Sequence, residues 1–155
     1  MTQDEVIARE SIRQTITNYT IAGDIRDAAL FSEQFAEHGT LEFAGFPPVP
    51  GFKCEGLEAI RRWTGAWGSL RNVDDPTLRS ASFARHNLTT CHIELTGRDT
   101  ATARTFFIVV TDIGPDHAGT YSDLLVRHDD RWLFARRRIV LDWRAPDSIY
   151  PAVKR

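Results

Sequence analysis

A histidine stands early in the stretch ASFARHNLTTCHIEL, which runs from Ala81 to Leu95. The aliphatic and β-branched residues that follow it favour a β-strand. Because side chains alternate along a strand, we expect His86 on the same face as Leu88, whereas Ile93 faces the other way. An imidazole titrates at about pH 6.5, so it can take a proton from a bound substrate near neutral pH. A histidine at a strand edge is also commonly a structural residue, so both interpretations stay open.

Two more residues with chemical potential lie near the N-terminus, where a helix is expected. Tyr19 belongs to an apolar stripe that it forms with Ile12 and Ile16. Its hydroxyl can donate a hydrogen bond to a carbonyl or leaving oxygen, although a core tyrosine is an equal alternative. Asp24 follows Gly23, in a position that is also typical of a helix cap.

The elements that position these residues follow from capping and periodicity. Thr2 and Glu5 have capping-box spacing, which predicts a helix that ends at Gly23. A second helix follows at once, with Asp24 or Asp27 as its cap, and is predicted to end near Gly39. A third helix is predicted from apolar residues at helical spacing, namely Leu57, Ile60, Trp63, Trp67 and Leu70.

The second half of the chain is typical of strands. Four runs, FARHNLTTCHIEL, TATARTFFIVVTDI, GTYSDLLVRH and RWLFARRRIVLDW, are separated by the turn segments TGRD, GPDHAG and DD. GTLEFAG adds a short earlier strand. Helices followed by strands indicate an α+β domain with the helices on one face of a mainly antiparallel sheet. FPPVPGFKCEG is predicted to be an ordered loop, and the tail RAPDSIYPAVKR to lie along the surface.

Composition excludes several classes of partner. The 155 residues predict one domain, residues 1–155. The net charge of −2 argues against nucleic acid or an anionic membrane as partner. No apolar run approaches the ~20 residues of a membrane helix. The polar N-terminus does not resemble a signal peptide, so we expect a cytoplasmic protein with free thiols at Cys54 and Cys91. The five histidines lack ligand spacing, so no metal is expected. The glycines are scattered through loops and form no nucleotide cradle, so no other cofactor is expected.

Four segments follow one another in an order that a known family shares: IRQTITNYTIAGDIRDAALFSEQFAEHGTLEF, ARHNLTT, LTGRDTATART and AGTYSDLLVRHDDRWLFARRRIVLD. They resemble the opening helices, the histidine strand, the G-D-x-A-x-A hairpin and the closing hairpin of SnoaL-like domains. These domains belong to the nuclear transport factor 2-like (NTF2-like) superfamily, in the group of scytalone dehydratase and the ring-dioxygenase β subunits. The resemblance extends from Glu5 to Trp143.

This resemblance implies a cystatin-like, NTF2-like cone. Three helices from the N-terminal half would pack on a curved sheet that encloses a pocket. Members commonly associate through the outer face of the sheet, so a homodimer or trimer is expected. The superfamily includes dehydratases, isomerases, cyclases, dehydrochlorinases and epoxide hydrolases, and also non-catalytic subunits and binding modules. The fold therefore does not settle the function.

The resemblance also implies an active-site pair. Asp24 and His86 match the aspartate–histidine dyad of the scytalone dehydratase-like and hexachlorocyclohexane dehydrochlorinase-like enzymes. A carboxylate bonded to one ring nitrogen fixes the tautomer and stabilises the imidazolium, while the other nitrogen abstracts a proton. The related dehydratases use a second histidine, and none aligns here, since His117 is expected in a turn. The epoxide hydrolases use two aspartates bridged by an arginine, for which Asp123 and Arg104 have poor spacing.

The other candidates are expected to bind substrate. Tyr121 and Asp123 share one strand face, as pocket polar groups or as a cross-strand pair on the dimer face. Arg137 points opposite to Arg136 and Arg138 on a strand, so it could reach the interior and pair with a carboxylate. The alternative is a solvated strand face, on which Arg136 and Arg138 pair with acids such as Asp142. The expected apolar and aromatic walls are Tyr19, Phe31, Phe35, Phe43, Trp63, Trp67, Leu88 and Phe106.

Two functions are expected from these residues. The first is a cofactor-free acid–base enzyme with Asp24, His86 and Tyr19 as its catalytic residues. It would bind a small cyclic or aromatic compound and catalyse elimination, such as dehydration, or isomerisation. The alternative is a non-catalytic ligand-binding or accessory module that resembles the β subunit of aromatic-ring dioxygenases. The enzyme needs its dyad open to a pocket, whereas the accessory module needs a large apolar outer face.

Overall fold

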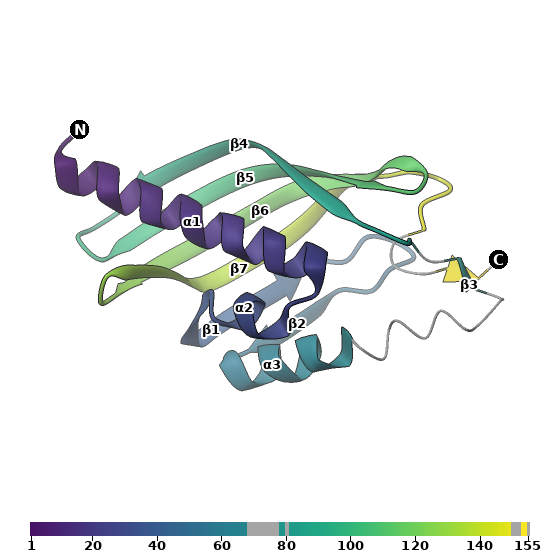
Figure 1. The fold of residues 1–155 in the computed structure, drawn as a ribbon, viewed down its shortest axis with the longest axis horizontal. Coiled ribbons are helices and arrows are strands. Elements are labelled where there is room, and N and C mark those ends of the chain that lie inside the picture. The colour runs from purple at the N-terminus through teal and green to yellow at the C-terminus, as the bar shows by residue number, and fades with distance from the viewer. Residues whose placement is uncertain (68–77, 80, 150–152, 155) are drawn as a thin grey trace.

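The computed structural model shows one layer of helices on the concave face of a curled sheet (Figure 1). It describes residues 1–67, 78–79, 81–149 and 153–154. The helices are α1 (Gln3–Ile25), α2 (Ala28–Ser32) and α3 (Leu57–Gly65). The main sheet contains β1 (Phe35–Phe43), β2 (Phe52–Glu55), β4 (Arg85–Leu95), β5 (Thr100–Thr111), β6 (Gly114–His128) and β7 (Arg131–Arg144). Two short strands, β3 (Leu78–Arg79) and β8 (Val153–Lys154), pair with each other.

The caps of the first two helices show which of two aspartates, Asp24 or Asp27, caps a helix. The capping box of Thr2 and Glu5 is confirmed, with both of its hydrogen bonds present. α1 runs two residues past the predicted stop at Gly23 and ends at Ile25, and the C-cap residue Arg26 has the left-handed conformation. Asp27 caps α2 by accepting a hydrogen bond from the backbone N–H of Leu30 at 2.9 Å. Asp24 therefore lies in the last turn of α1 and does not cap α2.

Two predicted boundaries in the first half are wrong. The second helix stops at Ser32 and does not reach Gly39, because the chain from Phe35 onward pairs with β7. The N–H of Phe134 on β7 donates to the carbonyl of Gln34 at 2.9 Å, so strand pairing replaces the helix there. Residues 52–55, expected in an irregular loop, form β2 against β1. The expected helical position of Leu70 lies outside the described residues.

The sheet order is β2-β1-β7-β6-β5-β4, and only the β1–β7 pair is parallel. This mixed, mainly antiparallel sheet curls without closing, as Figure 1 shows, and confirms the cystatin-like, NTF2-like α+β fold expected from the sequence. The turn before β6 is shorter than predicted. GPDHAG was expected to be a turn, but β6 begins at Gly114 and includes the whole segment.

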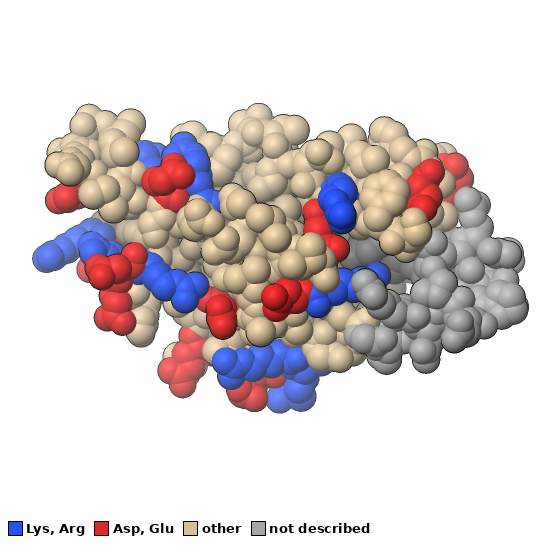
Figure 2. Space-filling model, in the orientation of Figure 1, with Lys and Arg blue, Asp and Glu red and all other residues tan. Residues whose placement is uncertain are grey.

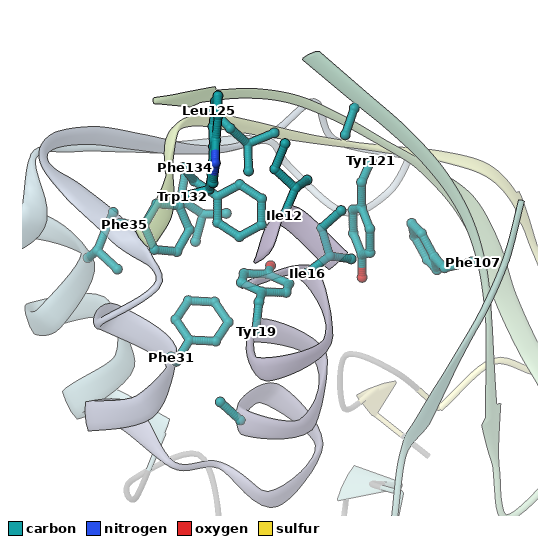
Figure 3. Packing of buried hydrophobic residues seen from close by; sticks show 14 of the residues in the cluster. Ile12, Ile16, Tyr19, Phe31, Phe35, Phe107, Tyr121, Leu125, Trp132 and Phe134 are labelled. Carbon is teal, nitrogen blue, oxygen red and sulfur yellow. The ribbon is translucent and has the colours of Figure 1, made fainter. Parts of the chain in front are cut away.

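The core lies between α1 and the concave face of the sheet. Ile12, Ile16 and Tyr19 from α1 pack against aromatic and aliphatic residues of the strands (Figure 3). Their partners include Phe134 and Leu125, both almost fully buried. On the helical face, acidic and basic side chains are intermixed (Figure 2). No described helix has both the length and the apolar character needed to cross a membrane.

Candidate active site

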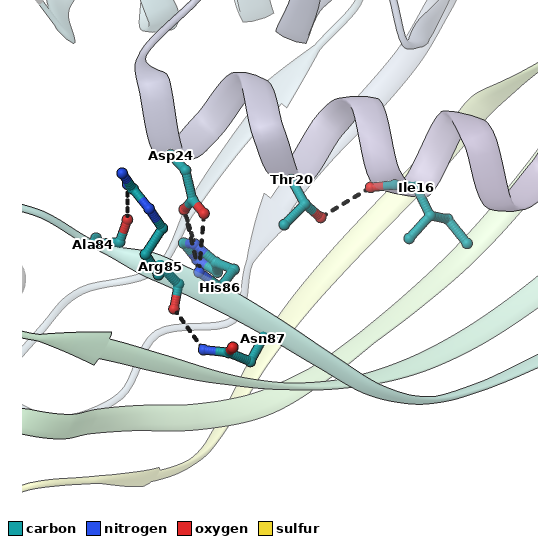
Figure 4. A network of polar contacts seen from close by, with 7 residues as sticks. All are labelled: Ile16, Thr20, Asp24, Ala84, Arg85, His86 and Asn87. Carbon is teal, nitrogen blue, oxygen red and sulfur yellow. Dashed lines mark hydrogen bonds and ion pairs between the residues drawn. The ribbon is translucent and has the colours of Figure 1, made fainter.

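Asp24 and His86 meet where the end of α1 crosses the start of β4 (Figure 4). Asp24 Oδ1 lies 2.6 Å from His86 Nδ1, and the backbone N–H of His86 donates to Asp24 Oδ2 at 3.1 Å. Because a carboxylate only accepts hydrogen bonds, Nδ1 carries the proton of the neutral ring and Nε2 holds the lone pair. The side chains of this Asp24–His86 dyad are 11% and 19% exposed, so the dyad is not sealed inside the core.

A β-bulge explains why neither predicted face of this strand was cleanly apolar. The pairing of β4 with β5 shifts register between Leu88 and Cys91, so the two residues between them are both exposed. Before the bulge, His86 and Leu88 turn toward the interior. After it, the alternation is reset and Ile93 is buried at 4% exposure. The expectation that His86 and Ile93 lie on opposite faces is therefore wrong, because a bulge inserts one extra residue into the alternation.

A second histidine lies beside the dyad. His117 was expected in a turn, but it is buried in β6. Strand register places it opposite Val109 of β5, which in turn lies opposite His86. The two histidines therefore flank Val109 on the inner face, and their ring centroids are 6.4 Å apart at an interplanar angle of 83°.

His117 has a carboxylate partner of its own. Its Nδ1 lies 2.7 Å from Oδ1 of Asp116, a fully buried side chain. Burial lowers the pKa of His117 below its ordinary value, although Asp116 opposes this effect. The positive charge that His86 carries when protonated, and that of Arg144, lower it further. His117 is thus held in its neutral form near pH 7.

This lowered pKa predicts an acid-sensitive contribution to stability. The folded state binds the His117 proton less readily than the unfolded chain, whose histidine pKa is about 6.5. Stability is therefore lost as the pH falls below about 6.5. We expect the free energy of unfolding, measured by urea denaturation, to fall less in His117→Gln than in the wild type when the pH is lowered from about 7.5 to about 5.5. Parallel losses in the two proteins would contradict this expectation.

Arg137 and Asp123 form a buried ion pair at the centre of the interior. Arg137 Nε donates to Asp123 Oδ1 at 2.8 Å and Nη2 donates to Oδ2 at 2.6 Å, and both side chains have 0% exposure. Burial opposes the charge of Arg137, but Asp123 outweighs this and raises the pKa of the guanidinium. The rings of Tyr19, Tyr121 and Phe134 lie 4.1, 4.3 and 4.0 Å from the guanidinium carbon.

The arginines next to Arg137 face outward. Arg138 pairs with Glu42 at 3.0 Å, and not with Asp142, which accepts a hydrogen bond from Thr120. Arg104, considered as the bridge of an epoxide hydrolase-like site, is exposed beside Phe106 on the outer face.

Most of the expected walls do face the interior. Tyr19 contacts Phe31 at 4.4 Å between ring centroids, and Phe31 lies 4.9 Å from Trp67. The interior or its edge also holds Phe35, Phe43, Trp63, Leu88 and Tyr121. Phe106 is the exception, since it is 40% exposed on the outer face. Its neighbour Phe107 takes the interior place, stacked on Tyr121 at 4.4 Å and 5.9 Å from the ring of His86. Alternation alone could not decide which of the two adjacent phenylalanines points inward.

Sequence reasoning missed Asp116, His117 and Phe107 as site residues. The turn assigned to GPDHAG hid the strand that carries Asp116 and His117. Alternation could not have placed both of these neighbours inward, nor could it choose Phe107 over Phe106 on β5. Within the described residues, no three histidine, cysteine, aspartate or glutamate side chains gather as ligands for a metal ion.

The curled sheet, its helical cover and the polar groups of its interior define a cystatin-like, NTF2-like protein. The model of the SnoaL-like domain matches residues 4–138, and the chain therefore belongs to the SnoaL-like domain family. A comparison with curated proteins gives no significant match.

Solved structures show the same fold. A candidate scytalone dehydratase from Novosphingobium aromaticivorans is 20% identical, with 99% of this chain and 100% of that chain covered and a TM-score of 0.71. The hexachlorocyclohexane dehydrochlorinase LinA-type3 from Novosphingobium barchaimii is 16% identical, with 92% of each chain covered and a TM-score of 0.70. The β subunit of a candidate aromatic-ring-hydroxylating dioxygenase from Novosphingobium aromaticivorans is 14% identical, with coverages of 91% and 93% and a TM-score of 0.71. At these identities the likeness shows the fold alone.

Proposed function

We propose that this protein is an acid–base enzyme that acts on a small cyclic or aromatic compound by elimination, such as dehydration, or by isomerisation. The observation that carries the proposal is the 2.6 Å contact between Asp24 Oδ1 and His86 Nδ1, in side chains that retain partial exposure. Such a pair presents a basic Nε2 with a fixed orientation. Similar structures include a candidate scytalone dehydratase and a hexachlorocyclohexane dehydrochlorinase, names that fit elimination chemistry.

In this mechanism His86 Nε2 takes a proton from a carbon next to a carbonyl or a leaving group. The imidazolium that forms is stabilised by the Asp24 carboxylate on the opposite ring nitrogen. Tyr19 is proposed to donate a hydrogen bond to the oxygen on which negative charge develops. Its ring packs against that of Phe31 at 4.4 Å between centroids (Figure 3). The guanidinium carbon of Arg137 lies 4.1 Å from the centroid of the same Tyr19 ring, and these contacts limit its movement.

The interior also supports the proposed substrate class. Flat side chains lie on the inner side of the dyad, with Phe107 5.9 Å from the ring of His86 and stacked on Tyr121, and with Tyr19 edge-on to Tyr121 at 5.9 Å. Aromatic walls favour flat, largely apolar ligands, and a few polar groups fix their orientation. A second histidine, His117, lies 6.4 Å from His86 between ring centroids, although the sequence had led us to expect none there, and this supports a dehydratase-like reaction.

Proton exchange tests this function without knowledge of the product. Small cyclic ketones, alcohols and halides are incubated with the protein in D2O, and loss of the exchangeable C–H signal or formation of an alkene is followed by proton NMR. We expect catalysed exchange or elimination for members of this panel, and its loss in His86→Ala. Exchange at the wild-type rate in His86→Ala would contradict the acid–base mechanism.

A specific observation fits the accessory form of the second candidate function, a ligand-binding or accessory module. The outer face of the sheet exposes Phe106, Leu124 and Trp143 at 40%, 40% and 44%. Exposed apolar patches commonly mark protein interfaces. A homodimer or trimer through this face is therefore part of the proposal, for an enzyme and for an accessory module alike.

The expected assembly can be tested by charge insertion on the outer face. We expect the double variant Phe106→Lys/Trp143→Lys to be a monomer in analytical ultracentrifugation at a concentration where the wild type is a dimer or trimer. Two lysines on each copy would place like charges in a desolvated contact. The matched control is Phe83→Lys, since Phe83 is 41% exposed but precedes β4 and lies outside the sheet face. An unchanged mass in the double variant would exclude this face as the interface.

A further inference from the structure

Asp116 is a fully buried carboxylate that joins three segments of the chain. Its Oδ1 accepts hydrogen bonds from His117 Nδ1 and from Ser148 Oγ, both at 2.7 Å. Its Oδ2 accepts from Thr111 Oγ1 at 3.2 Å and from the backbone N–H of Ile149 at 3.0 Å. Burial by itself would raise the pKa of Asp116, but hydrogen bonds from Ser148, His117 and Ile149 outweigh it and lower the pKa. The carboxylate therefore stays ionised inside the protein.

The C-terminal segment supplies half of these donors. The tail was expected to lie along the surface, but Ala145, Ser148 and Ile149 are only 6%, 3% and 4% exposed. The backbone N–H of Ala145 also donates to the carbonyl of Asp116 at 2.8 Å. The expectation was wrong because a buried aspartate on β6 needs donors that the sheet alone does not provide.

The same carboxylate determines how His117 faces the dyad. Neighbouring residues on a regular strand point to opposite faces, yet Asp116 and His117 are both buried and bonded to each other. The register of β5 against β6 shifts between the pairs Val109–His117 and Val110–Pro115, so Asp116 is the extra residue of a bulge and can face inward beside His117. With Nδ1 committed to Asp116, the ring of His117 stands edge-on to His86.

We propose that Asp116 is a positioning residue that holds His117 against His86, and that the C-terminal segment Ala145–Ile149 in turn holds Asp116. The inference rests on the proposed acid–base function, to which it adds a second carboxylate–imidazole pair and a part of the chain that completes the site. Among the described residues, the charged or titratable groups that act on His117 are Asp116, His86 and Arg144.

A double-mutant cycle read by NMR tests this inference without substrate. The titration of His117 is followed in the wild type, in Asp116→Asn, in Ser148→Ala and in the double variant. Asp116→Asn is expected to lower the pKa of His117, because the negative charge that favours the imidazolium is lost. A loosened structure would instead expose the buried ring and raise its pKa.

Ser148→Ala is expected to raise the pKa of His117, because Asp116 keeps its charge with one donor fewer. In the Asp116→Asn background the same substitution is expected to have no effect, since its influence passes through the carboxylate. Asp142→Asn is the matched control, because Asp142 also accepts a hydroxyl hydrogen bond at 2.9 Å but lies on the outer face. An unchanged or raised pKa in Asp116→Asn, or an equal effect of Ser148→Ala in both backgrounds, would overturn the inference.

Kinetics separates this inference from the proposed function. For a substrate found in the exchange screen, Asp116→Asn is expected to lower kcat about 10- to 100-fold with little change in KM, by analogy with the loss seen when the partner that orients a metal-bound histidine is removed. If turnover does not depend on His86, the proposed function fails, while the NMR cycle still decides whether Asp116 positions His117.

Discussion

Replacement of His86 by alanine is expected to lower turnover by at least about 10²- to 10⁴-fold, the range that a general base contributes. The fold is expected to remain intact for a local reason. Asp24 keeps the hydrogen bond from the backbone N–H of residue 86 at 3.1 Å, so its carboxylate is not left without a donor. We expect the free energy of unfolding to change by no more than about 1 kcal/mol, as is usual for a partly exposed side chain.

His92→Ala provides the matched control on the same strand. His92 lies on β4 past the bulge and is exposed on the outer face, so its loss removes an imidazole without touching the dyad. We expect wild-type exchange rates in His92→Ala and none above background in His86→Ala, measured by proton NMR in D2O. Equal rates in the two variants would mean that His86 is a structural residue, and would favour the ligand-binding or accessory module.

The second large effect is expected on stability. Arg137→Met is predicted to cost about 3–5 kcal/mol of unfolding free energy, because it leaves the buried Asp123 carboxyl, whose pKa burial raises, with no cation beside it. Both side chains have 0% exposure, so water cannot replace the lost partner. The guanidinium also lies against three aromatic rings, and the loss of these contacts adds to the cost.

The adjacent residue offers a control of the same type. Arg138 also bonds a carboxylate, that of Glu42 at 3.0 Å, but its side chain is 44% exposed. Arg138→Met is expected to change stability by about 0–1 kcal/mol, as exposed ion pairs do. The double variant Arg137→Met/Asp123→Leu is expected to recover most of the loss, because it removes both buried charges. Similar urea midpoints for Arg137→Met and Arg138→Met would show that the buried pair contributes little.

Much of the fold was predictable because its signals are local. The capping box at Thr2, the helical stripe through Ile12 and Tyr19, and the alternation of the late strands each depend on a few neighbouring residues. The order of motifs then indicated the family, and it paired Asp24 with His86, which the structure brings into contact. The catalytic role of that pair stays a prediction.

The errors arose where pairing between distant strands decides the outcome. A register shift in β4 turned Ile93 inward, and pairing with β7 converted the expected end of a helix into the start of β1 at Phe35. Neither event has a local signal, because a bulge or a new strand is selected by the partner across the sheet. The choice of Phe107 over Phe106 for the interior has the same origin.

The sequence by itself determined most of the helices and strands, their order, and the chemical groups available for acid–base work, because periodicity and capping depend on neighbours in the chain. Only the tertiary structure decided which of those groups meet. It placed His117 beside His86, enclosed Asp123 with Arg137, and brought Ser148 and Ile149 to Asp116. The physical reason is that a buried charge must find donors or a counter-ion wherever the fold brings them, and those partners come from segments far apart in the chain.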